Sequence, residues 1–213
     1  MGWSFKIINI FKPLFLYYKI DLKKISVITI LLVIIVAGLI LGSNYKMVGN
    51  VIKGFDKESE NTKVLFKTNM GDITIELYND MPITTNNFEN LVKQGVYNGI
   101  IFHRVINGFM IQGGDPTGTG FGDSSIPNIQ DEFTHKSGNK NNRGTISMAN
   151  AGPNTGSSQF FINLVDNNFL DSKHPAFGQV VQGMDIVDKI AKVKTGPGDK
   201  PLEEVKIIKA EIL

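Results

Sequence analysis

The chain has 213 residues, of which 42% are apolar and 20% charged, and its formal net charge is +2. The positive excess lies at the N-terminus: residues 1–24 hold five lysines and one aspartate, whereas residues 25–213 hold 17 basic and 19 acidic residues. A body of near-zero net charge does not favour broad nucleic-acid binding, which needs a clustered basic face. The absence of cysteine excludes disulfides, thiolate catalysis and cysteine-ligated metals.

An uncharged apolar run, ISVITILLVIIVAGLIL, covers residues 25–41. A helix of about 17 to 20 residues spans roughly 25–30 Å, which is enough to cross most bilayer cores. A cleaved signal peptide is the main alternative, but its apolar region is usually ~7–15 residues long and follows a short basic start. A buried core helix is a weaker alternative because the run is apolar on all sides. We therefore predict a transmembrane helix over residues 25–42.

The lysines around this run indicate an orientation. Lys19, Lys23 and Lys24 crowd its N-terminal flank, while the residues that follow carry a balanced mixture of charges. The positive-inside rule then places the N-terminus in the cytoplasm and the body outside. The prediction is a single-pass protein of the cytoplasmic membrane, with secretion after signal cleavage as the alternative.

These features divide the chain into four parts. Residues 1–24 form a basic and aromatic cytoplasmic segment, and residues 25–42 form the membrane span. Residues 43–62 are polar and lack a clear period, so we expect a flexible linker that holds the body roughly 25 Å from the membrane. Residues 63–213 form the folded body.

The body begins with a hairpin pattern. Residues 63–68 and 72–78 alternate apolar and polar side chains around Asn69-Met70-Gly71. Met81-Pro82 then breaks the pattern, and Thr84 or Thr85 is expected to cap a helix that runs to about Gln94.

Short strand-like runs make up most of the remaining body. They lie at residues 100–105, 109–112, 145–148, 159–164, 176–181 and 205–212, with a second helix expected at 184–193. Many short strands with only two helices favour a mainly β fold, a closed or nearly closed antiparallel barrel whose ends the helices cover.

A long stretch, residues 113–142, is rich in Gly, Asp, Ser and Asn, and irregular loops of this length are usually functional or disordered. Within it, Gly118-x-Gly120-x-Gly122 superficially suggests a phosphate loop. No Gly-Lys-Ser/Thr follows, so we interpret these residues as glycines at the edge of a groove.

The segment FHRVINGFMIQGGD, residues 102–115, has the most distinctive chemistry. If its two strands pair, the guanidinium of Arg104, the amide of Gln112 and the apolar side chains of Phe109 and Met110 could share one face. By spacing alone the simpler interpretation is favoured, in which Arg104 is a surface ion-pair partner and the other two belong to the core.

Two further blocks change this balance: GTISMANAGPNTGSSQFFI at residues 144–162 and NNFLDSKHPAFGQVV at residues 167–181. Together and in this order, the three blocks resemble the cyclophilins over residues 63–213. The resemblance implies a closed eight-stranded antiparallel barrel capped by two α-helices. It also implies cis-trans isomerisation of X-Pro peptide bonds without a cofactor.

The resemblance implies a role for individual residues as well. Arg104 matches the catalytic arginine. The positions that match the proline pocket and its peptide groove are Phe109, Met110, Gln112, Gly118, Ala149, Asn150, Gln159, Phe161, Phe169, Leu170 and His174. Many relatives have tryptophan at the position of Phe169, so weakened binding of cyclosporin-type cyclic peptides is expected.

The remaining expectations concern partners. His103, His135 and His174 are too widely spaced to indicate a metal site. The leading hypothesis is an active isomerase that acts outside the cytoplasmic membrane on proline-containing unfolded or exported polypeptides. The alternatives are a proline-segment binding module and a component of a membrane complex, neither of which requires turnover.

Overall fold

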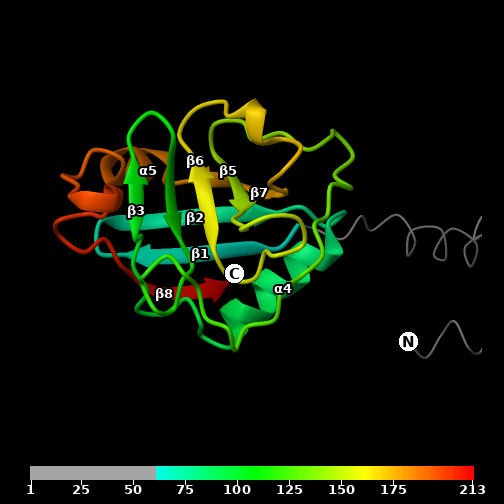
Figure 1. Ribbon diagram of the computed structural model, residues 1–213, viewed down its shortest axis with the longest axis horizontal. Coiled ribbons are helices and arrows are strands. Elements are labelled where there is room, and N and C mark those ends of the chain that lie inside the picture. The colour runs from blue at the N-terminus through cyan, green and yellow to red at the C-terminus, as the bar shows by residue number, and fades with distance from the viewer. Residues whose placement is uncertain (1–60) are drawn as a thin grey trace, which may run out of the picture. The chain divides into compact units, whose positions relative to one another are not determined.

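The computed structural model describes residues 61–213 (Figure 1). Within them no helix is both long and apolar enough to span a bilayer. The predicted cytoplasmic segment, the span at 25–42 and nearly all of the linker fall in residues 1–60, outside the described residues.

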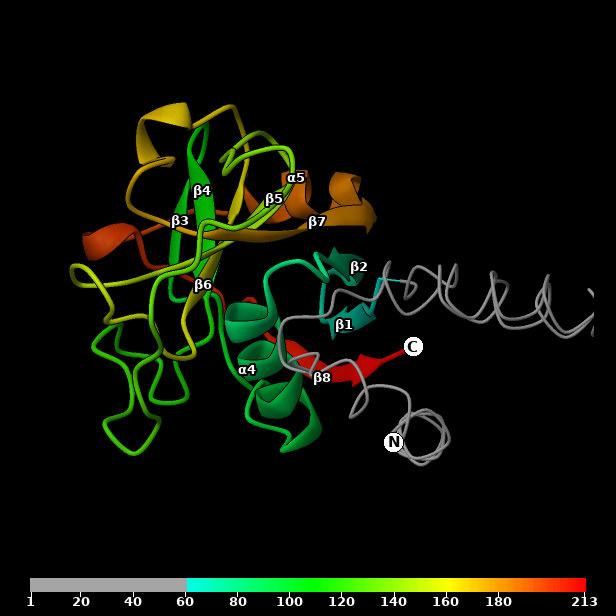
Figure 2. The ribbon, with the colours of Figure 1, turned by 90° about the vertical axis from the view of Figure 1, so that its right-hand side faces the viewer.

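The described residues form an eight-stranded antiparallel sheet with the order β3-β4-β6-β5-β7-β2-β1-β8. Figures 1 and 2 show β3, β4 and β6 crossing β1, β2 and β8, which lie on the other side of the fold. The strands are β1 (Lys63–Thr68), β2 (Gly71–Leu77), β3 (Arg104–Ile106), β4 (Met110–Gly113), β5 (Thr145–Met148), β6 (Phe160–Asn163), β7 (Ala176–Gln182) and β8 (Ile207–Ile212).

The prediction of a closed barrel is wrong, because the sheet is open between its edge strands β3 and β8. The seam is joined by the single bridge Ile101↔Lys206 and by a few hydrogen bonds, such as Phe102 N–H to the Val205 carbonyl at 2.9 Å. The predicted strand at 100–105 begins as a strand only at Arg104. The residues that meet the β8 segment therefore precede β3 and do not form a ladder with it.

Two α-helices, α4 (Pro82–Lys93) and α5 (Met184–Ile190), lie on opposite sides of the sheet (Figure 2). The predicted Thr cap of α4 is wrong. The helix begins at Pro82, whose missing N–H suits the first helical position, and both threonines are buried inside it. The N–H of Thr84 is satisfied by the Glu132 carboxylate at 2.9 Å. Two short 3₁₀ helices, η2 (Asn168–Leu170) and η3 (Pro197–Asp199), lie in the loops.

The core between sheet and α4 is aromatic. Phe66 packs against Phe160 with ring centroids 5.5 Å apart, and Phe88 packs against Tyr97 at 4.9 Å. All four rings are fully buried, and the Tyr97 hydroxyl donates to the Ser158 carbonyl at 3.0 Å. Tilted and edge-on ring pairs of this kind stabilise a core beyond their buried area. This core gives the short strands β3 to β6 a firm support.

Candidate active site

Four paired strands carry a row of side chains on the face that points away from the core. The register places Arg104 opposite Gln112, Gln112 opposite Phe161 and Phe161 opposite Ser147. Side chains alternate along a strand, so directly paired residues share a face. The neighbouring row, Val105, Ile111, Ile162 and Ile146, faces the central core. The Val105 row therefore contributes to the core, whereas the Arg104 row is available to form a site at the surface.

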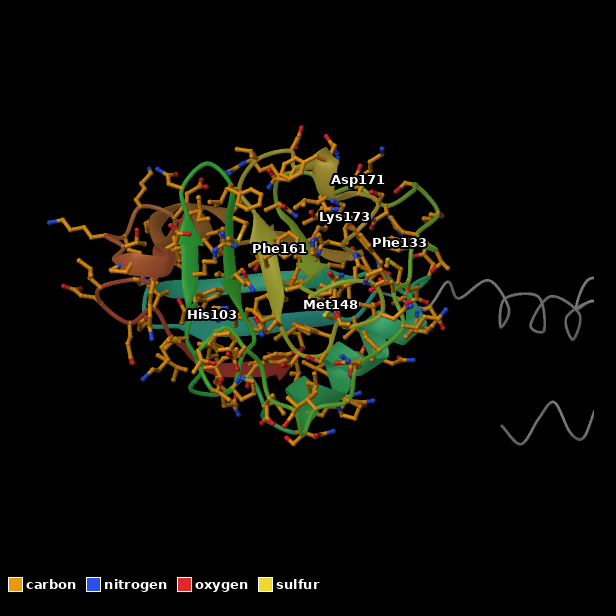
Figure 3. All side chains as sticks on the ribbon, viewed as in Figure 1. His103, Phe133, Met148, Phe161, Asp171 and Lys173 are labelled. Carbon is orange, nitrogen blue, oxygen red and sulfur yellow. The ribbon has the colours of Figure 1, made fainter. Side chains whose placement is uncertain are left out.

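A pocket of about 310 Å³ lies over the first row. Nine of the predicted site residues line it: Arg104, Phe109, Met110, Gln112, Ala149, Asn150, Phe161, Leu170 and His174. Met110 and Phe161 are only 1% and 5% exposed, yet neither belongs to the central core cluster. The structure therefore brings together one guanidinium, two side-chain amides and an apolar floor. Figure 3 marks the place of Phe161 in this site.

Arg104 also makes the surface ion pair that its spacing suggested. Its Nε lies 3.4 Å from Oδ2 of Asp199, which belongs to η3. The arginine side chain remains 43% exposed. Arg104 is thus a pocket residue and an ion-pair partner at once.

His174 packs against Phe161 at the side of the pocket. The two rings meet edge to face with centroids 5.4 Å apart. Nδ1 of His174 lies 3.0 Å from the Met148 carbonyl, which only accepts, so Nδ1 carries the proton in this bond. The imidazole is therefore fixed in orientation against the floor of the pocket.

Phe169 and Gly118 lie outside the set that lines the pocket. Phe169 is 69% exposed and stacks on Phe109, with ring centroids 6.0 Å apart, so it lies beside the pocket. Gly118 has φ +65 and packs near Ile101.

A larger neighbouring pocket, of about 660 Å³, shares Gln112, Ala149 and Asn150 with the first. Gln159 lines it, and its Oε1 accepts a hydrogen bond from Gln112 Nε2 at 3.0 Å. Asn150 is tied back by its own amide, which donates to the Lys173 carbonyl at 2.8 Å. The two pockets therefore adjoin, and two of their three shared residues, Gln112 and Asn150, are held by side-chain hydrogen bonds.

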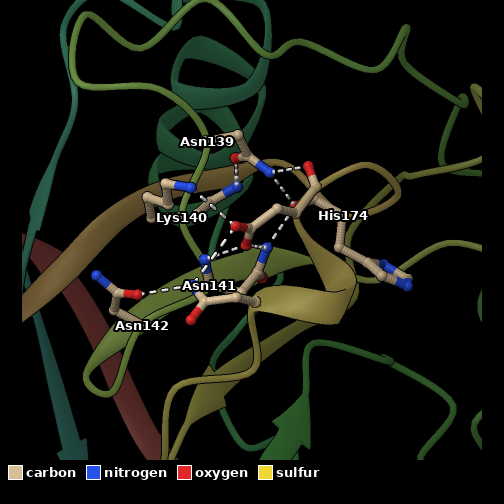
Figure 4. Close-up of polar contacts among 8 residues, drawn as sticks. Asn139, Lys140, Asn141, Asn142 and His174 are labelled. Atoms are coloured by element: carbon tan, nitrogen blue, oxygen red, sulfur yellow. Dashed lines mark hydrogen bonds and ion pairs between the residues drawn. The ribbon is translucent and has the colours of Figure 1, made fainter.

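An asparagine-rich scaffold that the sequence analysis missed holds the wall that carries Leu170 and His174 (Figure 4). The Asp171 carboxylate accepts from the Asn141 backbone N–H at 2.7 Å and from the Asn141 amide at 3.2 Å. Asn139 donates to the carbonyls of Asp171 and His174 and accepts from the Ala176 N–H. The Asn-rich run at 139–142 was the available sequence signal, but composition does not say which carbonyls the amides meet.

The pKa of Asp171 reflects this scaffold. Burial alone would raise it, but the hydrogen bonds from Asn141 and from Lys140 outweigh burial and lower it below its ordinary value. The carboxylate is therefore ionised at neutral pH and acts as an anchor for the loop.

A second missed network supports the part of the pocket that Phe109 lines. Asn167 donates to the Phe109 carbonyl at 2.9 Å and to Oδ1 of Asn163 at 2.8 Å. Asn163 is fully buried and donates in turn to Thr145 and Ser147. These amides fix the backbone from which Phe109 projects.

The other two histidines lie outside the pocket-lining set. Figure 3 shows His103 well separated from Phe161, at the start of β3. His103 is buried, its ring nitrogens have no hydrogen-bond partner, and burial lowers its pKa. His135 stacks on Tyr78 at 3.9 Å and bonds to Asp80 at 2.9 Å.

The pocket is suited to binding and polarising a peptide rather than to breaking a bond. It offers one permanent cation, neutral amide donors and acceptors, and an apolar floor. Within residues 61–213 no group of three or more His, Asp or Glu side chains is arranged to hold a metal ion.

Comparison with known proteins agrees with this chemistry. The family described as cyclophilin type peptidyl-prolyl cis-trans isomerase/CLD matches residues 63–212. A curated relative, peptidyl-prolyl cis-trans isomerase-like 1 of Aspergillus fumigatus, is 49% identical over 155 residues, which are 71% of this chain and 96% of the relative. Peptidyl-prolyl cis-trans isomerase ppi1 of Schizosaccharomyces pombe is 49% identical over 152 residues, 70% of this chain and 98% of the relative.

A solved structure agrees as well. A cyclophilin-type isomerase of Cryptosporidium parvum, 35% identical, superimposes with a TM-score of 0.68 and covers 72% of this chain and 98% of that one. The same isomerase solved in the presence of the dipeptide Ala-Pro gives a TM-score of 0.66 at 36% identity, covering 71% of this chain and 98% of that one. The chain therefore belongs to the cyclophilin-type peptidyl-prolyl cis-trans isomerases and is an enzyme that accelerates rotation about X-Pro peptide bonds.

Proposed function

We propose that Arg104 is the catalytic residue of this isomerase and that the adjoining pocket holds the proline ring. The observation that carries the proposal is the pocket itself, in which the guanidinium and the apolar side chains of Met110 and Phe161 line one hollow. The reaction breaks no covalent bond, so the site needs only to prefer the twisted amide to either planar form.

The arginine suits this task for an electronic reason. Peptide bonds resist rotation, with a barrier of ~18–20 kcal/mol, because the nitrogen lone pair is delocalised into the carbonyl. In the twisted state the proline nitrogen regains its lone pair, and a permanently charged guanidinium donates a hydrogen bond to it. One bond from a charged donor contributes ~1.5–3 kcal/mol, which corresponds to roughly 10- to 150-fold in rate.

Holding the substrate raises kcat/KM further, because it lowers KM. Phe109, Met110, Phe161 and Leu170 bind the proline ring, with His174 as a wall. Gln112, Gln159, Ala149 and Asn150 grip the chain beside it while the other side of the bond turns. Two hydrogen bonds support this arrangement by fixing the pocket: one from the Asn150 amide to the Lys173 carbonyl, and one from Gln112 to Gln159.

Arg104→Ala tests this mechanism, with Arg104→Lys as the matched variant that keeps a cation but loses the planar donors. The assay can use residues 61–213 alone, because the curated relatives consist almost wholly of the matching region. Both variants should keep the wild-type circular dichroism, and Arg104→Ala should lose at least about 10-fold in kcat/KM on a proline peptide. An Arg104→Ala variant as fast as wild type refutes the mechanism. Peptide binding without exchange by the wild type would favour the binding module.

The location and substrates extend the proposal to the whole chain. Residues 25–42 anchor the protein in the cytoplasmic membrane, residues 1–24 stay in the cytoplasm, and residues 43–62 tether the isomerase outside. The uncharged run and the lysines before it support this arrangement. The substrates there are proline-containing unfolded or exported polypeptides. Membrane fractionation with N-terminal sequencing tests it: a soluble product that begins after residue 42 would indicate a cleaved signal and secretion.

Phe169 gives the site a distinct ligand preference. Its ring stacks on Phe109 beside the pocket, but it lacks the indole N–H donor of the tryptophan that many relatives have. Cyclosporin-type peptides therefore bind weakly, while isomerase activity does not need that donor.

A further inference from the structure

A buried carboxylate that the mechanism does not use organises the loop beside the larger pocket. Asp115 is fully buried and lies two residues after the end of β4. Its two oxygens accept six hydrogen bonds from the loop. The donors are Thr117 N at 2.9 Å and Oγ1 at 2.8 Å, Thr119 N at 3.0 Å and Oγ1 at 3.3 Å, Gly120 N at 2.6 Å and Gly122 N at 3.3 Å.

This convergence requires an unusual backbone and an ionised acceptor. Gly120 and Gly122 have φ +87 and +82, a region that glycine enters without strain, so their N–H groups can turn inward. Burial raises the pKa of Asp115, but the bonds from Thr117, Gly120 and Gly122 outweigh it and lower the pKa below its ordinary value. A buried charge is tolerated only when it is fully hydrogen-bonded, so carboxylate and loop conformation depend on each other.

Gly120 connects the conformation of this loop to the pocket residues. Gly120 donates its N–H to Asp115, and its carbonyl accepts from Gln159 Nε2 at 3.1 Å. Because a carbonyl only accepts, Gln159 must direct its NH₂ to Gly120. Its Oε1 then accepts from Gln112 Nε2 at 3.0 Å. Gln112 stands opposite Arg104 in the strand register.

We propose that Asp115 is a positioning residue for substrate binding, which acts through the Gly120 carbonyl to orient the amides of Gln159 and Gln112. The proposal rests on the substrate-gripping role proposed above for these two glutamines. Asp115 lines neither pocket, yet through this chain of bonds it determines the affinity of the site for the substrate peptide.

The first test is Asp115→Asn in the full-length protein. The variant is nearly isosteric, but it offers a single acceptor oxygen and places an NH₂ group against donors. The grip acts on ground state and transition state alike, so KM for a proline peptide should rise about 2- to 13-fold with kcat nearly unchanged. Asp80→Asn is the matched control. Its carboxylate also holds a loop, by accepting a hydrogen bond from the Lys136 N–H at 2.8 Å. Asp80 lines neither pocket, so KM should not change.

A double-mutant cycle separates positioning from a general loss of structure. Gln159→Ala should raise KM, and Asp115→Asn should then add less than about 2-fold in that background. An equal rise in both backgrounds overturns the link through Gln159. An unchanged KM in Gln159→Ala alone overturns the gripping role and this proposal with it, whereas the Arg104 mechanism is judged by its own variants.

Thr117→Val provides a milder perturbation if Asp115→Asn does not fold. It removes one of the six donors and keeps the carboxylate and the backbone bond. A smaller rise in KM, up to about 3-fold with kcat unchanged, is expected. A fall in kcat with unchanged KM would contradict the proposal.

Discussion

Asp171→Ala is the most informative perturbation of the scaffold behind the pocket. The side chain is 19% exposed, and its short bond of 2.7 Å goes to the backbone N–H of Asn141, which is fully buried. A bond to a charged acceptor contributes ~1.5–3 kcal/mol, and a buried donor left unpaired costs its desolvation. The outer contact to Lys140 is an exposed pair that contributes about 0–1 kcal/mol. We expect the free energy of unfolding to fall by about 2–4 kcal/mol.

Asp171→Ala should also weaken substrate binding in the pocket. Asp171 lies between Leu170 and His174, and the loop that carries both is held by the Asn139 and Asn141 amides. Loss of the anchor should loosen this wall and raise KM more than it lowers kcat. The loss of stability should depend on pH. A carboxyl with a lowered folded-state pKa contributes fully above its unfolded pKa of about 3.9 and loses that contribution as pH falls through the folded value.

Equilibrium urea unfolding of residues 61–213 at pH 7 and at pH 3, followed by circular dichroism, measures these effects. Asp166→Ala is the control, because within residues 61–213 its exposed carboxylate accepts a single hydrogen bond, from the Arg143 N–H at 2.8 Å. It should cost about 1 kcal/mol or less. A loss below 1 kcal/mol in Asp171→Ala, or a loss that does not shrink at the lower pH, would refute the anchoring role.

Three further outcomes are expected. Phe169→Trp restores an N–H donor and should tighten cyclosporin-type binding about 2- to 13-fold by isothermal calorimetry, with kcat/KM unchanged; no gain would mean that the indole donor has no partner in this chain. Asp199→Asn removes the exposed partner of Arg104 and should lower kcat/KM by no more than about 5-fold, less at high salt; a 100-fold loss would make Asp199 part of the chemistry. Gly178→Ala would place a Cβ 2.5 Å from the Glu76 carbonyl oxygen and should lower the unfolding free energy by about 1–3 kcal/mol; a variant as stable as wild type in urea would contradict this close approach.

Strands were predictable where a periodic pattern faced a core. The hairpin of β1 and β2 and the strand at 145–148 were located from alternation and sequence blocks, within a residue of their observed ends. Closure of the barrel was not predictable, because it depends on whether Ile101 and Lys206 continue a ladder or form one bridge. The α4 cap was misplaced because Thr84 and Thr85 have the right chemistry for a cap, whereas Pro82 has the right backbone for the first turn.

The pocket-lining set was predictable because it repeats a family pattern, and three of its members, Arg104, Gln112 and Phe161, lie side by side on neighbouring strands. Its supports were not, because Asp115, Asp171 and Asn167 act through bonds to backbone groups. Such bonds depend on where a loop returns in space, which neither composition nor spacing states. Asp199 was missed for a related reason. It lies 95 positions from Arg104, and only the fold brings η3 to β3.

The pairing of β1 with β8 has a consequence for how the chain is made. These strands come from the two ends of the body, Lys63–Thr68 and Ile207–Ile212, yet they lie side by side in the sheet. Contacts between such distant segments must pay the entropy of closing a very long loop, which slows folding. The hairpin of β1 and β2 is synthesised well before β8, so the outer edge of β1 stays uncovered until Ile207–Ile212 has been made. The isomerase body therefore completes its sheet only after β8 has emerged and paired with β1.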